Sequence, residues 1–355
     1  MTRPLKNLRK KIDTIDNRIL ELLDERAQIV SKVNKVKEKK KITVFSPTRE
    51  VAILKRLKKL NKGNLKDLDV ELIFKEIFSV FRALRATLKT AYLGPEGTFT
   101  HTAAIKNFGR KVQYVSCDSI REVFAIVEKG EAEYGVVPVE NSIEGVINYT
   151  LDMFFESNLK ICAEIALDIQ HDFLIYHCGR KIKRIYSNPQ VFPQCRRWLA
   201  KNYPHATLVP VVSTALAAFE AKKDTQGACI GSRILATLYD LKVLRTNIQD
   251  AASNRTRFLV IAKGDSPLTG QDKTSMLFSI KDKVGALHDS LYTFKKYGIN
   301  LTKIESRPSK KKMWEYYFFV DFEGHRTEPT VERSLKALEK VCNFVKILGS
   351  YPKGN

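Results

Sequence analysis

The sequence lacks any paired spacing of its cysteines. The six, at positions 117, 162, 178, 195, 229 and 342, include no Cys-x-x-Cys pair. This argues against a zinc site and a disulfide framework, so we expect reduced, mostly buried thiols. No apolar stretch of about 18 residues lacks charge, so no membrane span is expected. Residues 1–11 are polar and basic. They predict no secretory signal and therefore a cytoplasmic protein.

Acidic residues are also scarce relative to basic ones. Lys and Arg number 61 against 39 Asp and Glu, for a net charge of +22. Such a field favours anionic partners, and both nucleic acid and small dianionic metabolites qualify. The apolar fraction of 44% and the charged fraction of 28% are ordinary for folded domains. At roughly 150 residues per domain, 355 residues correspond to two or three domains.

The first 88 residues are predicted to form an all-helical domain. Apolar residues recur at three- and four-residue steps over residues 5–41, which predicts one helix of roughly 55 Å. Further helices are expected at 48–60 and 68–88. A lone helix of that length cannot bury its apolar stripe within one small domain. The pattern therefore predicts an intertwined helical dimer.

Three cations lie along the polar side of the long helix. Arg26 and Lys37 are three turns apart on one face, about 16 Å from each other, whereas Arg9 lies about 25 Å from Arg26. A small metabolite cannot bridge Arg9 and Arg26 of one chain. If both serve one site, Arg9 must come from a partner chain. The alternative is that all three are solvated surface cations.

The order of residues in this region resembles the all-helical chorismate mutase family. The matching segments are Leu8-Arg9, Asp16, Leu20–Leu23, Glu25-Arg26, Val33–Lys37 and Arg49-Glu50. The resemblance implies that Arg9 and Arg26 clamp the substrate's carboxylates and that Lys37 donates to its ether oxygen. It also implies that Glu50 binds the ring hydroxyl, with Ser46 and Arg49 nearby. The reaction is a Claisen rearrangement, which needs only a compact conformer and a cation at the breaking bond.

Two positions of the third helix depart from the family pattern. The family has a serine and a glutamine in the site where this chain has Phe81 and Arg85. Phe81 removes a polar contact, while Arg85 still offers donors to an ether oxygen and adds a full charge. Mutase activity is predicted. The alternative is a helical domain that only dimerises.

The pattern changes at Thr90, where short apolar runs begin to alternate with helical stretches. This predicts an α/β domain over residues 90–263 with a largely parallel sheet, long enough for two lobes. A polar linker containing Gly and Pro follows at 264–274. Several polar motifs lie where a strand is expected to end, which is where α/β sheets bind ligands. The turn Gly94–Thr100 is expected to offer backbone N–H groups to an anion.

Taken in order, these motifs resemble the prephenate dehydratase family. They are Gly94–His101, Val136–Ser142, Tyr186–Gln190 with Gln194, Ser213–Ala215, Gly231-Ser232 and Asn254–Phe258. The resemblance implies a two-lobed dehydratase that removes water and carbon dioxide from prephenate to give phenylpyruvate. It implies no metal and no organic cofactor. Whether arogenate is also a substrate stays open.

The resemblance makes Thr256 the essential catalytic residue. We expect its hydroxyl to hold the departing hydroxyl group within a network that includes Asn141 and Glu140. Glu140 is the proton source if burial raises its pKa. Arg257 either binds substrate or forms a structural ion pair.

Other residues of these motifs are secondary candidates. The further substrate-binding residues expected are Thr98, Phe99, Asn141, Ser142, Ser187, Gln194, Ser213, Thr214 and Phe258. For Ser213 taken alone, a helix cap is the favoured interpretation. His101 is expected to have a helix-surface or packing role, and the histidines make no convincing catalytic set.

The last region, residues 275–350, is predicted to fold as a ferredoxin-like βαββαβ plait, an α+β unit. Its runs Gly285–Leu287, Ile299–Thr302 and Lys303–Pro308 resemble the ACT regulatory domain of the phenylalanine pathway. The resemblance implies phenylalanine binding across a domain pair by Gly285, Ala286, Leu287, Asn300, Glu305, Ser306 and Arg307. The alternative is a plait that only dimerises.

The chain as a whole therefore resembles a three-part, bifunctional enzyme of phenylalanine biosynthesis. It is expected to convert chorismate to prephenate and then to phenylpyruvate, with feedback inhibition by phenylalanine. We expect an even-numbered homo-oligomer that binds neither nucleic acid nor membrane. Two other functions compete: a dehydratase whose helical domain is silent, and a non-catalytic two-lobed protein that binds small anions.

Overall fold

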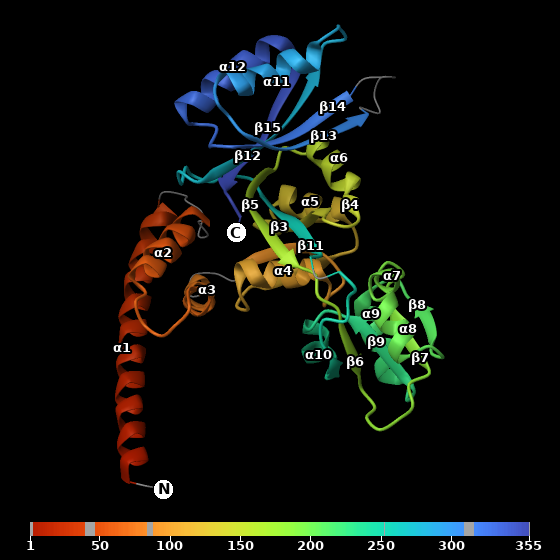
Figure 1. Ribbon diagram of the computed structural model, residues 1–355. Helices are drawn as coiled ribbons and strands as arrows, with labels where there is room; N and C mark the ends of the chain where they lie inside the picture. The colour runs from red at the N-terminus through yellow and green to blue at the C-terminus, as the bar shows by residue number, and fades with distance from the viewer. Residues whose placement is uncertain (1–2, 40–46, 84–87, 252, 309–315, 355) are drawn as a thin grey trace.

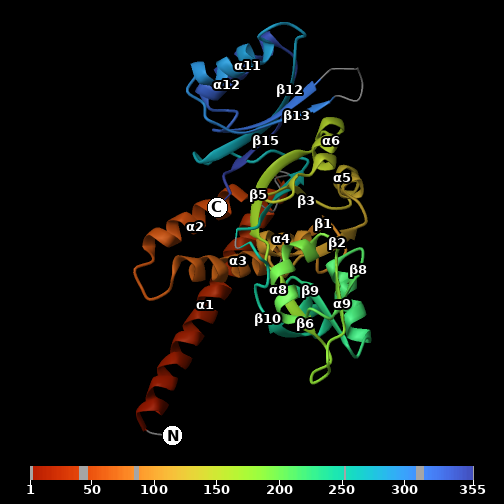
Figure 2. The same cartoon turned by 45° about the vertical axis from the view of Figure 1, so that its right-hand side comes forward.

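The chain folds into a helical domain, a two-lobed domain and a C-terminal α+β domain (Figure 1). The computed structural model describes residues 3–39, 47–83, 88–251, 253–308 and 316–354. The helical domain consists of α1 (Arg3–Lys39), α2 (Pro47–Leu60) and α3 (Asp67–Ala83). α1 extends away from the rest of the molecule in both views (Figures 1 and 2). None of residues 4–36 is buried, so the apolar stripe of α1 lies open within one chain.

The first lobe of the middle domain is built on a sheet with the order β2-β1-β3-β11-β5, and β4 pairs with β3. Its strands are β1 (Lys89–Leu93), β2 (Gln113–Cys117), β3 (Tyr134–Asn141), β4 (Gly145–Val146), β5 (Lys160–Asp168) and β11 (Arg255–Ala262), and its helices are α4 (Phe99–Phe108), α5 (Ile120–Lys129) and α6 (Asn148–Glu156). Two fully or nearly buried apolar clusters line the two sides of this sheet.

The second lobe is built on a sheet with the order β10-β6-β9-β7-β8. Its strands are β6 (Asp172–Ile175), β7 (Arg184–Ser187), β8 (Thr207–Pro210), β9 (Gly227–Gly231) and β10 (Lys242–Arg245), and its helices are α7 (Val191–Gln194), α8 (Arg196–Asn202), α9 (Thr214–Lys223) and α10 (Ile234–Tyr239). The chain enters this lobe after β5 and leaves it before β11. Two short connections therefore join the lobes.

The prediction of a largely parallel sheet is wrong for both lobes. β1 pairs in parallel with β2 and β3, but β11 runs antiparallel to both β3 and β5. In the second lobe β7 pairs in parallel with β8 and β9, whereas β6 is antiparallel to β9 and β10. Apart from the short β4, which pairs antiparallel with β3, the antiparallel strands β5, β6, β10 and β11 are the ones that flank the connections between the lobes. Parallel neighbours need a long crossover connection, whereas antiparallel neighbours do not. The alternation of strands and helices along the sequence therefore does not reveal the direction of these strands.

The C-terminal domain confirms the predicted βαββαβ order. Its elements are β12 (Asp272–Ile280), α11 (Ala286–Lys296), β13 (Leu301–Pro308), β14 (Tyr316–Glu323), α12 (Pro329–Val341) and β15 (Cys342–Pro352). The antiparallel sheet has the order β13-β14-β12-β15. Its two helices cover the side away from the first lobe (Figure 1). On the other side, Leu277, Phe319 and Tyr351 join an apolar cluster of the first lobe.

The six cysteines are free, and all but Cys178 are buried, which confirms the expected thiols. None of the helices that the structure describes is long and apolar enough to cross a membrane.

Candidate functional site

A polar network joins the two lobes at their connections, and it contains three of the predicted residues. Asn141 Nδ2 donates to Thr256 Oγ1 and to Asn254 Oδ1, both at 2.8 Å. Asn141 Oδ1 accepts from the backbone N–H groups of Ile143 and Glu144, which fixes the orientation of the amide. Thr256 is only 7% exposed. Its hydroxyl oxygen is therefore held as an acceptor, and its own proton can point elsewhere.

The same network continues into the second lobe through Gln194. Gln194 Oε1 accepts from Asn254 Nδ2 at 3.0 Å, and it lies 2.8 Å from His171 Nε2. Gln194 Nε2 donates to Glu144 at 2.9 Å. Burial lowers the pKa of His171 below its usual 6.5, although its hydrogen bond with Gln194 and the charge of Asp172 partly oppose this. His171 is thus neutral and donates from Nε2.

We call His171, Asn141, Gln194, Asn254 and Thr256 the hinge network. β11 is antiparallel to β3 with Thr256 opposite Asn141, which places their side chains on the same side of the sheet. Asn254 and His171 lie in the two connections between the lobes, and they are 3% and 1% exposed. The network therefore sits where relative movement of the lobes would change its geometry.

Several other predicted residues serve the local fold. Thr98 and Ser213 are N-caps: each side-chain oxygen accepts from a backbone N–H in the first turn of α4 or α9. Ser187 Oγ donates to a backbone carbonyl of β9 at 2.8 Å, and Thr214 and Phe258 are buried. For Ser213 the cap alternative is confirmed.

Two predicted residues lie beside the hinge network. The ring of Phe99 meets that of His171 edge-on, with centroids 5.6 Å apart. Ser142 Oγ donates to the carbonyl of Ser253 and accepts from the N–H of Arg255, which ties the end of β3 to the start of β11.

The expected anion site at the turn after β1 is contradicted for three of its N–H groups. Gly94 N donates to Cys117 O, Gly97 N to His101 Nδ1 and Thr98 N to Pro95 O. These donors satisfy the turn itself and leave none of their own for an anion. His101 is buried and stacks on Tyr92 with centroids 4.7 Å apart, so its predicted packing role is confirmed.

Glu140 and Arg257 face the other side of the sheet from Thr256. They are the strand neighbours of Asn141 and Thr256, and successive side chains of a strand point to opposite sides. The Glu140 carboxylate accepts from Lys303 at 2.7 Å, while Arg257 donates to Glu164 at 2.8 Å and to Asp321 at 2.6 Å. The proton-source role expected for Glu140 has no support in this placement. For Arg257, the ion-pair alternative matches the contacts.

In the helical domain, the structure brings together Arg26, Glu50 and Phe81. The Arg26 guanidinium lies over the Phe81 ring at 4.4 Å, and its Nη1 is buried without a hydrogen-bond partner. Arg82 forms an ion pair with Glu50 and donates to Phe108 O of the middle domain at 2.5 Å. Burial raises the pKa of Glu50 even against Arg82. Phe81 therefore packs against a cation at the position where the family has a polar residue.

Of the other residues predicted for this site, the structure describes the side chains of Arg9 and Arg49 alone. Arg49 is exposed on α2. Arg9 lies seventeen residues before Arg26 on the same helix, about 25 Å away, so it does not reach this cluster within one chain. The side chain of Lys37, together with Ser46 and Arg85, falls outside the residues that the structure describes.

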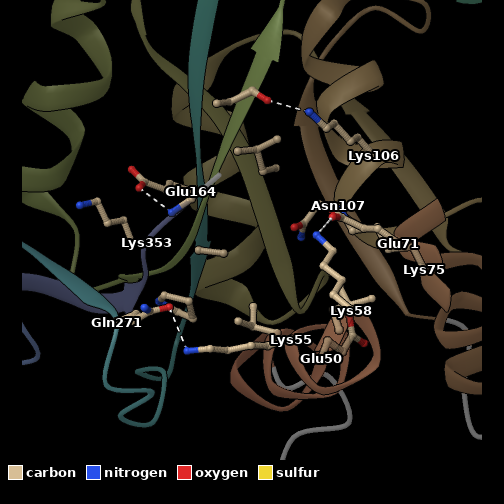
Figure 3. Close-up of a pocket in the computed structure, with 17 residues that line it drawn as sticks. Glu50, Lys55, Lys58, Glu71, Lys75, Lys106, Asn107, Glu164, Gln271 and Lys353 are labelled. Atoms are coloured by element: carbon tan, nitrogen blue, oxygen red, sulfur yellow. Dashed lines mark hydrogen bonds and ion pairs between the residues drawn. The ribbon is translucent and has the colours of Figure 1, made fainter. Parts of the chain in front are cut away.

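A cavity of about 380 Å³ lies between α2, α3, α4 and β5, beside Glu50 (Figure 3). Five of the residues that line it are the lysines Lys55, Lys58, Lys75, Lys106 and Lys353. Although burial by itself would raise it, hydrogen bonds from two of these lysines lower the pKa of Glu71 to about 2. The cavity contains no member of the hinge network.

All of the predicted effector residues except Asn300 lie toward one end of the C-terminal sheet. Arg307 pairs with Tyr317 of β14, which pairs with Ser279 near the end of β12. Arg307 and Ser279 are therefore two strand spacings of about 4.8 Å apart. The turn that holds Gly285 and the last residues of β13 thus lie at the same end of the sheet. Gly285 begins α11 with a positive φ of 78°. Arg307 donates to Asp152 of α6 at 3.2 Å.

Of the remaining effector candidates, Asn300 precedes β13 and lies at the opposite end of the sheet, beside Glu323, so it is not brought together with Gly285 and Arg307 within one chain. Ala286 is buried and Leu287 packs on the core of the C-terminal domain, while Asn300 O accepts from Glu323 N. Glu305 is half-buried and Ser306 is exposed on β13.

Comparison with known proteins decides the family. Residues 8–86 match the family Chorismate mutase type II, residues 90–266 match Prephenate dehydratase, and residues 274–340 match the ACT domain. The bifunctional chorismate mutase/prephenate dehydratase of Aquifex aeolicus is 48% identical over 354 residues, or 98% of each chain. The chain belongs to this bifunctional family. The enzyme of the same description from Pseudomonas aeruginosa is 45% identical, also over 98% of each chain.

A solved structure supports the same assignment. The prephenate dehydratase of Arthrobacter aurescens in complex with L-Phe is 32% identical, with a TM-score of 0.69 over 75% of this chain and 90% of that one. The three resemblances and the fold class predicted from the sequence are confirmed. The non-catalytic alternatives are not favoured, because the family match runs through the whole chain.

Within this bifunctional family member, sequence reasoning missed four polar residues. His171 and Asn254 belong to the hinge network, Glu144 accepts a hydrogen bond from its Gln194, and Arg82 pairs with Glu50. Asn254 and Glu144 lie at or beside the ends of dehydratase motifs, so motif proximity could have suggested them. No sequence motif lies near His171 or Arg82 that would mark either of them as a site residue. Among the described residues, no three His, Cys, Asp or Glu side chains converge to hold a metal.

The neutral buried histidines predict loss of stability in acid. Burial lowers the pKa of both His171 and His101 in the folded state, so below about pH 6.5 the unfolded chain binds more protons. The free energy of unfolding should fall from pH 6.5 downward, by at most about 1.4 kcal/mol per pH unit for each histidine. Trp198, which packs on Phe173, reports the unfolding of the second lobe by fluorescence in urea. His171→Asn should flatten this dependence. An equally steep dependence in that variant would contradict the assignment.

Proposed function

We propose that the two reactions of this enzyme take place at two separate sites of the chain. The enzyme rearranges chorismate to prephenate and dehydrates and decarboxylates prephenate to phenylpyruvate in phenylalanine biosynthesis, under allosteric control. The hinge network is the proposed dehydratase site, and the Arg26–Glu50–Phe81 cluster belongs to the mutase site. The observation that carries the first assignment is the Asn141–Thr256 hydrogen bond at the junction of the lobes.

The dehydratase step requires hydroxide to leave while the ring becomes aromatic. Because Asn141 donates to Thr256 Oγ1, the threonine proton is free to donate toward the leaving hydroxyl. A threonine hydroxyl is too weak an acid to protonate that group alone, so it acts by hydrogen bonding within a water-poor site. Asn254 and Gln194 keep the amide of Asn141 in place. Closure of the lobes around substrate would exclude water.

The mutase step requires a compact substrate conformer and positive charge at the breaking bond. Arg26 offers its unpartnered Nη1 to a carboxylate, and Phe81 holds the guanidinium plane. Glu50, kept in place by Arg82, is positioned for the ring hydroxyl. We assign Arg9, Lys37, Ser46, Arg49 and Arg85 to the same site on the family pattern.

A homodimer completes the mutase site in this proposal. Ten apolar side chains along α1 are between 42% and 60% exposed, a stripe that one chain leaves open. They are Leu5, Leu8, Ile12, Ile15, Ile19, Leu20, Leu22, Ile29, Val33 and Val36. An exposed apolar stripe of this length marks an association surface. A second copy of α1 would cover the stripe and bring its Arg9 to Arg26.

The proposed effector is phenylalanine, bound at the end of the C-terminal sheet toward which Gly285, Ala286, Leu287, Glu305, Ser306 and Arg307 lie. Asn300 lies at the opposite end of the same sheet and is not assigned to this site within one chain. The Arthrobacter aurescens relative was solved with L-Phe, which supports an amino-acid effector. We also propose a cytoplasmic location, in keeping with six free thiols.

Incubation of the purified protein with chorismate alone tests the two activities together. We expect phenylpyruvate to accumulate, because prephenate made at the mutase site is consumed at the hinge network. Prephenate without phenylpyruvate would contradict the dehydratase assignment. Unchanged chorismate, with prephenate still converted when supplied directly, would reduce the helical domain to a dimeriser. L-Phe added to the same reaction should lower the yield of phenylpyruvate.

A further inference from the structure

The side of the first-lobe sheet opposite the hinge network is pinned to the C-terminal domain by charged contacts. We call Glu140, Glu164, Arg257, Lys303 and Asp321 the interdomain ion cluster. Arg257 donates to Glu164 at 2.8 Å and to Asp321 at 2.6 Å, and a third hydrogen bond at 2.9 Å joins it to the fully buried Tyr351. Three hydrogen-bond partners thus orient the guanidinium of Arg257, which lies on the same strand as Thr256.

Lys303 ties β3 to the C-terminal domain, as Asp321 ties β11 to it. Its ammonium group donates to Glu140 Oε2 at 2.7 Å, and its side chain is only 14% exposed. Arg257 Nη1 lies 4.0 Å from the same oxygen. Lys303 and Asp321 are paired across β13 and β14, so one row of the C-terminal sheet holds both contacts.

The strand that supplies Lys303 also supplies the proposed effector residues. Lys303, Glu305 and Arg307 alternate along β13 and share one side of the sheet, and their burial alternates accordingly. Lys303 and Arg307 both reach first-lobe carboxylates, those of Glu140 and Asp152. Four residues of extended chain, about 13 Å, separate them. A shift of β13 therefore moves Glu140 and α6 together.

We infer that Lys303 is a positioning residue of the dehydratase, and that its ion pair with Glu140 carries effector occupancy from β13 to Asn141 and Thr256. This inference rests on the proposed hinge-network site. Glu140 is one residue from Asn141, so moving its carboxylate turns the strand end that carries the Asn141 amide. Positioning effects at this range are large, because an ångström of misplacement can cost about a hundredfold in rate. Ligand bound by Glu305, Ser306 or Arg307 of β13 need only bias that strand between two positions.

The first test compares Lys303→Met with Lys303→Arg in the full-length enzyme. Methionine keeps the length of the side chain and removes its charge, whereas arginine keeps the charge. We expect Lys303→Met to lower kcat for prephenate about tenfold with little change in KM, and to raise the half-inhibiting L-Phe concentration at least about fivefold. Lys303→Arg should retain most of the wild-type kcat and most of the wild-type sensitivity to L-Phe. Lys336→Met, which removes an exposed ion pair on α12, is the matched control and should leave both unchanged.

Several results would overturn the inference. Wild-type kcat and wild-type L-Phe response in Lys303→Met would do so, and so would equal defects in the methionine and arginine variants, since charge would then be irrelevant. The mutase rate of the same preparations shows whether the chain is folded. If wild-type enzyme fails to convert prephenate at all, the proposed function fails instead.

A second variant changes the other partner of the Lys303–Glu140 ion pair, and it tests the inference even if Lys303→Met does not fold. Glu140→Gln should also weaken L-Phe inhibition, and the double variant should be no worse than the poorer single variant, because both remove one contact. Normal L-Phe inhibition in Glu140→Gln would overturn the inference. So would additive losses of kcat, which would indicate that Glu140 acts on the substrate independently of Lys303.

Discussion

Replacement of Thr256 by valine should lower the dehydratase kcat by about a hundredfold to a thousandfold, or about 3–4 kcal/mol. Valine matches threonine in shape, so the buried position stays filled while the hydroxyl is lost. The hydroxyl oxygen accepts from Asn141, so that hydrogen bond does not occupy the hydroxyl proton. Removal of the hydroxyl should therefore act on the transition state rather than on the fold.

The controls separate chemistry from folding. Thr256→Ser should retain activity within about tenfold, because the hydroxyl remains. Thr207→Val, at the exposed start of β8, is the matched change without a predicted effect. The measurement is the initial rate of phenylpyruvate formation from prephenate, with the mutase rate of each variant as the internal reference. A Thr256→Val enzyme that keeps a third or more of its activity would contradict the role.

Removal of either Arg9 or Arg26 should lower the mutase rate about a hundredfold, since each leaves a substrate carboxylate without its partner in a desolvated site. Co-expression of the two alanine variants should then return about a quarter of the wild-type rate. Half of the dimers formed at random contain one chain of each kind. In such a dimer one site combines intact Arg9 with intact Arg26, and the other site lacks both.

This recovery depends on a site shared between chains. If both arginines acted within one chain, every site of the mixed dimer would lack one of them, and no activity would return. Lys10→Ala, beside Arg9 on α1, should leave the mutase rate unchanged. The dehydratase rate should be unaffected in all these preparations, because the hinge network lies in another domain. A monomeric wild-type protein in sedimentation would also contradict the shared site.

The division of the chain into three parts follows from local sequence patterns. The three- and four-residue apolar period of residues 5–41, unbroken by Gly or internal Pro after Pro4, predicts α1 because local hydrogen bonding and one apolar face are sufficient to define a helix. The βαββαβ order of the last region followed from the same kind of local pattern. Thr256, Asn141 and Gln194 belong to motifs that are specific enough to mark them as site candidates from sequence alone.

The contacts that these residues make depend instead on how distant segments pack together. Strand direction depends on pairing with distant residues, so the antiparallel courses of β5, β6 and β11 were not visible in the local pattern. His171 entered the hinge network because the connection between the lobes passes beside Gln194, although 23 residues separate them in sequence. The separation of Asn141 and Thr256 from Glu140 and Arg257 followed from strand alternation once β3 and β11 were paired. Contacts of this kind depend on three-dimensional packing, which neighbouring residues do not encode.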